Sequence, residues 1–358
     1  MGKRKILFSI AYLSGGGAER VISILTDQLV HYGWKVGVLI EKATPNEYPL
    51  HEGVTVLRMS ERGGYLSLKR FKERYRLVRD FDPDILMPFL LTSSVYAAIN
   101  SFLLQKKWIY CVRNNPWQCV SIRERFKKML SDFLAILSNG IMVQNNKQIN
   151  YFNYFLGKKI FVVPNPVNKE IITSHKTITQ INKIMTVGRL EYQKNHRMLI
   201  DAFVRVHDKY PNTQLNIYGE GSLKVELQHY IDSLNASQFI SLCGRTNDIR
   251  TVYENADMFV MSSDFEGMPN ALLEACTMGL PCIATDCLTG PSDIIDNGTT
   301  GLLVPIRNVE RMVDAICFYI ENPKIAQFMA NKGQQFCIDN YSSEKVVKCF
   351  IKGLDLIY

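Results

Sequence analysis

The sequence of 358 residues contains no C-x-x-C pair, and its nine cysteines are an odd number. This pattern offers neither the ligand spacing of a structural zinc site nor an even set of partners for a disulfide framework. Low-complexity tracts and repeats of fixed period are also missing, which argues against a disordered chain and against a solenoid. These absences predict a globular protein of a reducing, cytoplasmic compartment.

The sequence also has no strong candidate for a membrane-spanning segment. The most apolar stretch, residues 85–104, contains Pro88, Asn100 and the polar run Thr92–Ser94, a composition that fits a strand, a turn and a buried helix better than a span. The apolar run from Ile6 to Leu13 is short and leads into glycines. It therefore predicts a buried first strand rather than a signal peptide.

Motifs for metal chemistry are lacking too. Asp80, Asp82 and Asp84 form a D-x-D-x-D run, but it falls between a basic stretch and an apolar one, which predicts the end of a helix rather than a metal site. No histidine occurs between residues 100 and 150. We expect no metal and no cofactor, and we expect His196, in K-N-H, to cap or pack at the start of a helix.

The charge is distributed unevenly along the chain. Through Asn165 there are 24 basic and 12 acidic residues, whereas the remainder has 18 basic and 22 acidic residues. Nucleic acid and an anionic membrane surface would both suit a basic first half. Because no nucleic-acid motif accompanies the charge, we predict no nucleic-acid partner and favour an anionic membrane surface or an anionic lipid substrate.

Two basic stretches carry much of this charge. Residues 66–81 and 121–134 each place apolar residues at helical spacing, and basic residues fill the positions between them. The apolar positions are Leu68, Phe71, Tyr75 and Val78 in the first stretch, and Ile122, Phe126, Leu130 and Phe133 in the second. Such helices can lie on anionic headgroups, at about 1 kcal/mol per basic residue. Alternatively, each packs its apolar stripe beneath a solvated face.

The chain is long enough for two α/β domains, and 47% of its residues are hydrophobic. A strand, a glycine turn, a helix and a second strand open the sequence, and further strands are predicted at Thr55–Arg58, Asp84–Met87, Trp108–Val112 and Gly140–Val143. The segment Phe161–Asn168 contains two prolines, and the alternation of strands and helices restarts after it. We predict domains at 1–165 and 166–342, with a final helix at about 343–358 packing back on the first.

The stretch SSDFEGMPNALLEACTMGLPCIATD, residues 262–286, contains the most informative motif. It predicts a strand end, a loop with Gly267 and Pro269, and a helix that starts near Asn270. The amide groups of the first helical turn attract anions, which suits a diphosphate. Glu266 precedes this helix and Glu274 lies eight residues further on.

The spacing E-x7-E with G-x-P-N between the glutamates resembles the signature of the family 4 glycosyltransferases. The resemblance covers nearly the whole chain, through SGGGAERV, VPNPV, VGRLEYQKNH, IYGEGSLKVEL, LCGRTNDI and GPSDIIDNGTTGLLVP in this order. It implies the GT-B fold, an α/β architecture in which two Rossmann-like domains with parallel, doubly wound sheets face each other across a cleft. It also implies that the first domain binds the acceptor and the second binds a nucleotide sugar.

The resemblance assigns roles to individual residues. Arg189 and Lys194 would bind the donor diphosphate and neutralise the leaving group, Glu266 would hold hydroxyls of the donor sugar, and Glu274 would bind the ribose. The other implied donor-binding residues are Gly16, Gly17, Gly244, Arg245, Gly267, Met268, Pro269, Asn270, Ala271 and Leu272.

One loop departs from the family pattern. Many members carry a histidine near the donor sugar, where this chain has CVRNNPW with Arg113 close to the expected position. Similar R-N-[DN]-P loops occur in a subset of bacterial surface-polysaccharide transferases. Arg113, Asn114 and Asn115 would therefore bind donor sugar or acceptor phosphate. The alternative is an arginine held in a structural salt bridge.

The resemblance implies a retaining hexosyltransferase. It would move a hexose or an N-acetylhexosamine from a UDP-sugar to a saccharide acceptor, polyprenyl-diphosphate-linked, in capsule, exopolysaccharide or O-antigen biosynthesis. Its place would be the cytoplasm, at the inner face of the plasma membrane. A GDP-sugar donor stays open. The alternatives are a non-catalytic, transferase-like subunit that binds nucleotide sugar and, far behind, a sugar-nucleotide 2-epimerase, which shares the fold but lacks this helix start.

Overall fold

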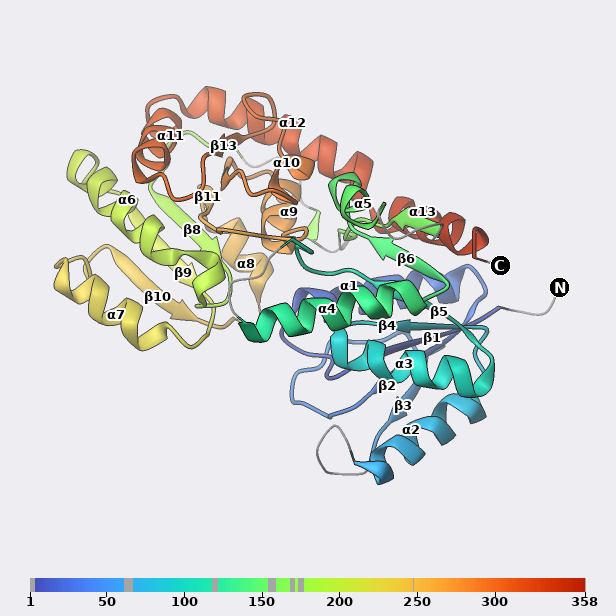
Figure 1. Cartoon of the computed structure of the whole chain (residues 1–358). Coiled ribbons are helices and arrows are strands. Elements are labelled where there is room, and N and C mark those ends of the chain that lie inside the picture. The colour runs from blue at the N-terminus through green and yellow to red at the C-terminus, as the bar shows by residue number, and fades with distance from the viewer. Residues whose placement is uncertain are drawn as a thin grey trace. The chain divides into compact units, whose positions relative to one another are not determined.

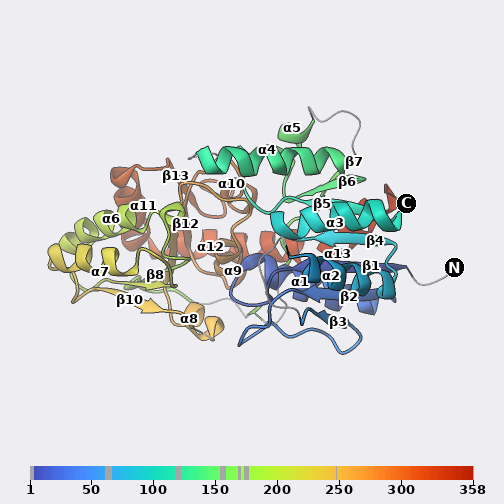
Figure 2. The ribbon, with the colours of Figure 1, turned by 60° about the horizontal axis from the view of Figure 1, so that its bottom comes forward.

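The computed structural model describes residues 4–60, 67–117, 122–153, 159–167, 171–172, 177–246 and 248–357 (Figures 1 and 2). The chain divides into two compact units. Unit 1 comprises Met1–Pro166 and Ser343–Tyr358, and unit 2 comprises Val167–Ser342. Each unit is a parallel sheet with helices on both of its faces, which is a Rossmann-like arrangement.

The sheet of unit 1 has the strand order β3-β2-β1-β4-β5-β6-β7. Its strands are β1 (Lys5–Ile10), β2 (Lys35–Ile40), β3 (Thr55–Arg58), β4 (Ile85–Pro88), β5 (Lys107–Cys111), β6 (Gly140–Val143) and β7 (Lys159–Val162). Its helices are α1 (Gly17–His31), α2 (Leu68–Phe81), α3 (Leu91–Leu104), α4 (Ile122–Leu137), α5 (Asn146–Phe152) and α13 (Ser343–Asp355). The strand order changes direction between β1 and β4, and ligands of such sheets bind at the carboxyl ends of the strands near this point.

Apolar side chains on both faces of this sheet explain its two helical layers. One core cluster joins the sheet to α1 and α13, where Phe350 stacks on Phe8 with ring centroids 6.2 Å apart. The other joins the sheet to α2, α3, α4 and α5. Strands that are buried on both faces read as continuous apolar runs, as in ILMP of β4.

The sheet of unit 2 has the order β10-β9-β8-β11-β12-β13. Its strands are β8 (Lys183–Val187), β9 (Gln214–Tyr218), β10 (Ile240–Gly244), β11 (Met258–Met261), β12 (Cys282–Thr285) and β13 (Leu302–Val304). Its helices are the short η2 (Tyr192–Lys194), α6 (His196–Lys209), α7 (Lys224–Ser233), α8 (Ile249–Glu254), α9 (Asn270–Thr277), α10 (Pro291–Ile294), α11 (Val309–Glu321) and α12 (Pro323–Tyr341).

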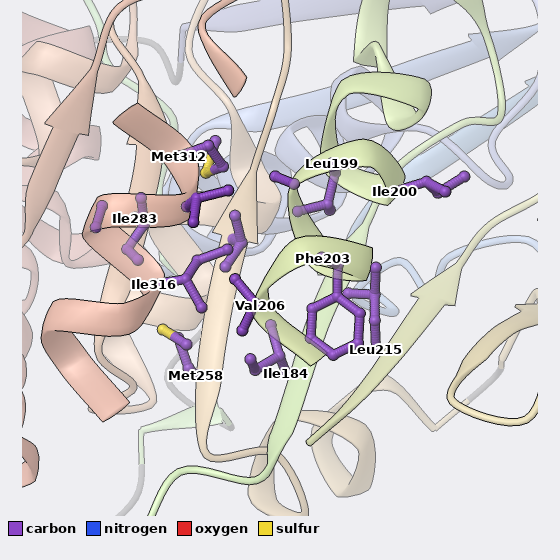
Figure 3. Close-up of a cluster of buried hydrophobic side chains, with 14 of the residues drawn as sticks. Ile184, Leu199, Ile200, Phe203, Val206, Leu215, Met258, Ile283, Met312 and Ile316 are labelled. Carbon is purple, nitrogen blue, oxygen red and sulfur yellow. The ribbon is translucent and has the colours of Figure 1, made fainter. Parts of the chain in front are cut away.

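Alternate residues of the central strands serve the two faces of this sheet. Met258 packs in the cluster with α6 and α11, drawn in Figure 3, where Phe203 and Ile316 lie against the sheet. The next residue, Phe259, packs in the opposite cluster with α8, α9 and α12. Because consecutive side chains of a strand point to opposite faces, a continuous apolar strand requires helices on both sides.

The predicted fold class is confirmed, since both sheets are parallel and doubly wound. Two strands, Thr55–Arg58 and Gly140–Val143, have the predicted bounds. The apolar stretch at residues 85–104 forms β4, a turn and α3, as expected. Within the described part of the chain, no helix combines the length and the apolar character that crossing a membrane requires.

The sequence-based expectation for α2 is wrong in one respect. Arg70 and Arg74 are almost fully buried, at 4% and 3% exposure, whereas the apolar Leu68 is 75% exposed. Both guanidinium groups pair with Glu41, at 3.4 Å for Arg70 and 2.8 Å for Arg74. Arg74 also lies 3.6 Å from the ring centroid of Tyr96. A buried carboxylate needs such partners, so these two arginines are not available to a lipid surface.

For α4, the alternative that the helix packs its apolar stripe beneath a solvated face does not hold. Phe126, Leu130 and Phe133 are 69%, 41% and 56% exposed, and Leu134 and Ala135 make the contact with the sheet instead. The side chain of Ile122 lies outside the described residues. The stripe therefore faces away from the core of unit 1.

Candidate active site

The residues that the sequence singles out in unit 2 lie in loops that follow neighbouring strands. β8, β9, β10 and β11 are parallel, so the loops after them emerge at one edge of the sheet. Arg189 follows β8, Gly244 ends β10, and Glu266 follows β11. The topology therefore gathers these three positions at the carboxyl edge, where sheets of this type bind ligands.

Two glycines in the loop after β9 hold the Arg189 loop in place. A Cβ on Gly219, whose φ is +151°, would lie 1.8 Å from the carbonyl oxygen of Gly188. A Cβ on Gly221 would lie 2.3 Å from the carbonyl oxygen of Leu190. The amide of Leu190 donates to the carbonyl of Glu220 at 3.0 Å. The motif G-E-G is thus needed here because two backbones touch without room for a side chain.

Lys194 and Glu266 form an ion pair at this edge. The ammonium group lies 2.6 Å from Glu266 Oε1, and the two side chains are only 15% and 8% exposed. Gln193 donates to the carbonyl of Phe265 at 2.8 Å and to Glu266 Oε2 at 3.3 Å, and it accepts from Arg189 Nη2 at 3.2 Å. The structure therefore brings Arg189, Lys194 and Glu266 into one hydrogen-bonded chain, with Gln193 as the link that the sequence did not reveal.

Asp264 and Asn195 fix the start of α6 beside this chain. Asn195 adopts the left-handed conformation, with φ +43°, and accepts from the amide of Met198 as an N-cap. Its amide group donates to Asp264 Oδ1 at 2.9 Å. Asp264 also accepts from Arg307 at 2.7 Å. The contact between Asn195 and Asp264 therefore anchors the loop that carries Lys194 to the loop that carries Glu266.

His196 is buried at the first position of α6, as expected for a packing role. One ring nitrogen, Nε2, lies 3.1 Å from the carbonyl oxygen of Arg189, and the other, Nδ1, has no hydrogen-bond partner among the residues with a described structure. A carbonyl only accepts, so Nε2 carries the proton. Burial lowers the pKa of His196 to about 4. The neutral ring thus holds the backbone of the Arg189 loop.

We expect His196 to make folding pH-dependent. The pKa is lower in the folded state than in the unfolded chain, so the unfolded state binds the proton first and stability falls as the pH drops below about 6.5. Between pH 7 and pH 5 the loss is about 2 kcal/mol in the free energy of unfolding. Urea titrations of the protein and of His196→Gln at both pH values measure it. The glutamine keeps a donor and cannot titrate.

The exposed His229 provides the control for that measurement. His229→Gln is expected to leave the difference in stability between the two pH values unchanged. If His196→Gln also left it unchanged, His196 would not be the titrating group.

The helix after Glu266 begins where the sequence predicts. α9 spans Asn270–Thr277, and Gly267, Met268 and Pro269 before it are buried. Asn270 and Ala271 are half-buried, whereas Leu272 packs in the core. The hydroxyl of Thr289 donates to the carbonyl oxygen of Glu266 at 2.5 Å and secures the loop from the other side.

Glu274 is not an ordinary exposed helix carboxylate. It is 7% exposed and accepts a hydrogen bond from the hydroxyl of Tyr253 at 3.2 Å. The same hydroxyl lies 3.2 Å from the carbonyl oxygen of Ala271. Tyr253 is a partner that no sequence signal indicated, because it lies on α8 and its contact depends on how α8 packs against α9.

Gly244 and Arg245 lie at the end of β10. Gly244 adopts φ +68°, and its carbonyl accepts from the amide of Gly219 at 2.8 Å. Arg245 is exposed. The structure therefore places these two residues next to the glycine loop of β9 and leaves the arginine side chain on the surface.

In unit 1, Gly16 and Gly17 start α1. Gly16 is its N-cap residue and Gly17 is its first residue. A Cβ on Gly16 would lie 2.1 Å from Glu19 Oε2, and Glu19 is 4% exposed. The absence of a side chain at Gly16 therefore leaves the space into which the Glu19 carboxylate folds back against the loop.

Arg113 belongs to a polar cluster at the carboxyl edge of the unit 1 sheet. Its Nη1 donates to Asn165 Oδ1 at 3.0 Å, and Gln144 donates to the same oxygen at 3.0 Å. These three residues follow β5, β7 and β6, respectively. Asn114 offers its carbonyl oxygen to Gln148, and Asn115 accepts from the amide of Trp117. Gln144 and Asn165 were not predicted, although Asn165 stands in the VPNPV motif.

The guanidinium of Arg113 is only partly satisfied. Within the described part of the chain, its buried Nε and Nη2 atoms have no hydrogen-bond partner, and the group lies 4.2 Å from the ring centroid of Phe89. Burial lowers the pKa of Arg113 to about 10, so the side chain stays charged at neutral pH. Among the residues that the structure describes, no carboxylate pairs with it. The structural salt bridge considered for Arg113 is therefore not found there. Nε and Nη2 form the edge of a guanidinium that binds phosphate or carboxylate in pairs.

Known proteins that this chain resembles in sequence are described as glycosyltransferases. The sequence model of the family described as "Glycosyl transferases group 1" matches residues 167–336, which is almost all of unit 2. The amylovoran biosynthesis glycosyltransferase AmsD of Erwinia amylovora is 28% identical, with 96% of this chain and 97% of that protein covered. The uncharacterized glycosyltransferase MJ1059 of Methanocaldococcus jannaschii is 31% identical, but the match covers only 64% of this chain and 62% of that protein.

Two further similarities extend over the chain. The GalNAc-alpha-(1->4)-GalNAc-alpha-(1->3)-diNAcBac-PP-undecaprenol alpha-1,4-N-acetyl-D-galactosaminyltransferase of Campylobacter jejuni is 25% identical, with 94% of each chain covered. The structure of a TarM variant from S. aureus, in complex with Fondaparinux, alpha-GlcNAc-glycerol and UDP, superposes with a TM-score of 0.84, covering 98% of this chain and 99% of that one at 14% identity. The fold is thus the GT-B fold, and the relatives support glycosyltransferase activity.

Proposed function

We propose that this protein is a retaining glycosyltransferase that moves a hexose or an N-acetylhexosamine from a UDP-sugar to a saccharide linked to polyprenyl diphosphate. The observation that carries the proposal is the buried ion pair between Lys194, which precedes α6, and Glu266, which lies in the loop before α9. Gln193 joins Arg189 to this pair. Cations beside the amides of a helix start suit a departing nucleoside diphosphate. Unit 2 then binds the donor, and unit 1 binds the acceptor.

Each residue of this arrangement has a chemical task in the proposal. Lys194 and Arg189 neutralise the diphosphate as the bond between the anomeric carbon and the phosphate oxygen breaks. The second oxygen of Glu266 accepts from donor-sugar hydroxyls, and Glu274 accepts from the ribose. The acceptor hydroxyl attacks the face that the diphosphate leaves, and its proton passes to a diphosphate oxygen. This route needs no protein base, unlike glycoside hydrolysis with its pair of carboxylates.

The remaining predicted residues keep their roles within the proposal. Gly244 and Arg245 lie beside the base, and residues 267–272 surround the diphosphate. Gly16 and Gly17 of unit 1 contribute to donor binding. Arg113 binds an anionic oxygen of the donor or of the acceptor diphosphate through the edge formed by its Nε and Nη2 atoms.

The acceptor class follows from two lines of support. The Campylobacter relative is named for an undecaprenol diphosphate acceptor, and the Erwinia relative for synthesis of the polysaccharide amylovoran. The basic excess of residues 1–165 suits a substrate with a diphosphate at an anionic membrane surface. We therefore propose a role in surface-polysaccharide synthesis at the cytoplasmic leaflet.

A transfer assay tests the function. Purified protein is incubated with a panel of UDP- and GDP-sugars and a short-chain prenyl-diphosphate saccharide, in EDTA. Release of nucleoside diphosphate together with a product of unchanged anomeric configuration by NMR is expected. Tight binding of UDP-sugar without UDP release for any acceptor would instead support the non-catalytic subunit. An inverted product, or activity that EDTA abolishes and Mg²⁺ restores, would contradict the mechanism.

A further inference from the structure

The helix α4 turns an apolar stripe away from the core of unit 1. An ordinary surface helix buries such a stripe and exposes its polar face. In α4 the exposed apolar side chains recur every three or four residues over about three turns. They are Phe126 (69% exposed), Met129 (66%), Leu130 (41%), Phe133 (56%), Ile136 (48%) and Leu137 (51%).

The neighbouring helix α3 exposes apolar side chains as well. α3 contacts α4, and the two helices lie side by side in both Figure 1 and Figure 2. Near its end α3 exposes Ile99, Phe102 and Leu103, with Phe102 at 83%. We call these nine side chains of α3 and α4 the α3–α4 apolar surface. Monomeric proteins in water seldom leave so many large apolar side chains together on one layer, so this surface is expected to have a partner.

The charges beside this surface identify the kind of partner. Arg125 and Lys127 are exposed between the apolar positions of α4. The acids of α4 are Glu124, in its first turn, and Asp132, which pairs with Lys128 at 3.3 Å and accepts from Tyr151. Residues 1–165 carry 24 basic and 12 acidic residues. A second copy of the chain would bring like charges together around the apolar stripe, whereas an anionic bilayer attracts them.

We propose that the α3–α4 apolar surface inserts into the interface of an anionic lipid bilayer, with Phe126 and Phe133 as its main anchors. This inference rests on the proposed function and deepens it, because it names the surface by which an enzyme with a lipid-linked acceptor meets the membrane. It also assigns membrane contact to α4 rather than to α2, because Arg70 and Arg74 of α2 are buried in ion pairs with Glu41. Apolar insertion with flanking basic residues is the physical basis of interfacial helices.

Vesicle flotation tests the proposal with the full chain. The vesicles contain about three parts phosphatidylcholine and one part phosphatidylglycerol. The double variant Phe126→Ser/Phe133→Ser is expected to lower the vesicle partition coefficient at least about tenfold, because two aromatic side chains no longer leave water. The variant Phe328→Ser, which removes an exposed phenylalanine of unit 2, is the matched control and is expected to bind like the unaltered protein.

Two outcomes would overturn the proposal. The first is flotation of the double variant equal to that of the unaltered protein, which includes the case in which salt abolishes the vesicle binding of both proteins. The second is a concentration-dependent dimer, by sedimentation, that the double variant loses without any loss of vesicle binding, which would make this surface an interface between copies. Thermal unfolding of each variant is measured as well. Because the replaced side chains are exposed, folding is expected to be preserved.

Calorimetry with UDP separates this proposal from the proposed function. The double variant is expected to bind UDP as the unaltered protein does, since neither phenylalanine is among the residues proposed to bind the donor. Failure of the unaltered protein to bind UDP would contradict the proposed function and leave the flotation result standing. Normal UDP binding with unchanged flotation would contradict only the membrane surface.

Discussion

Lys194→Met is expected to lower kcat by about 10²- to 10³-fold, because it removes a positive charge that offsets the charge developing on the departing diphosphate. Methionine keeps much of the length of the lysine side chain, so the change removes charge more than volume. The same substitution is expected to destabilise the fold by roughly 3 kcal/mol, since Glu266 would be left buried without its counter-ion. Steady-state transfer kinetics and urea unfolding measure the two effects.

A second substitution separates catalysis from folding. In Lys194→Met/Glu266→Gln a neutral amide replaces the buried carboxylate, so the stability that the single variant loses is expected to return in large part. Transfer activity is not expected to return, because the diphosphate still lacks its cation. Recovery of activity along with stability would show that Lys194 only supports the fold.

The chain offers a matched control for this pair. Lys224 and Glu220 also form a lysine–glutamate contact at 2.9 Å, but both side chains are about half exposed. Lys224→Met is expected to change stability by less than about 0.5 kcal/mol and to leave kcat unaltered. The contrast between two ion pairs of similar length isolates the effect of burial at the carboxyl edge of the sheet.

Arg113→Met is expected to lower kcat/KM for transfer by about 100-fold while leaving the melting temperature unchanged or higher. The side chain contacts Asn165 and Phe89, and no carboxylate pairs with it among the described residues. A buried charge of this kind costs free energy in the empty protein, so an apolar replacement relieves that cost. An anionic substrate loses its bidentate partner in the same step.

A loss of activity without a loss of stability makes the measurement decisive. If Arg113 had only a structural role, its replacement would lower the melting temperature of the protein, and activity would fall only as far as the folded fraction falls. Arg205→Met provides the comparison, because Arg205 pairs with Glu310 on the surface of unit 2 and is expected to affect neither quantity. Full activity of Arg113→Met would remove this residue from the site.

The candidate site was predictable from the sequence to the extent that it depends on local backbone chemistry. Gly267 and Pro269 before an apolar helical pattern give the start of α9 at Asn270. Gln193, Asp264 and Tyr253 were not predictable in this way. Each acts through a contact with a residue at least 18 positions away, and no periodicity in the chain encodes such a contact.

The sequence by itself determined the fold class, because continuous apolar strands alternating with amphipathic helices can be buried only in parallel sheets covered on both faces. Tertiary structure alone decided which face of a helix turns inward. In α2 the buried Glu41 draws Arg70 and Arg74 into the core, and in α4 the core takes Leu134 and Ala135 and leaves Phe126 and Phe133 outside. A helical pattern states which residues share a face, whereas the partners that face it come from distant strands and helices.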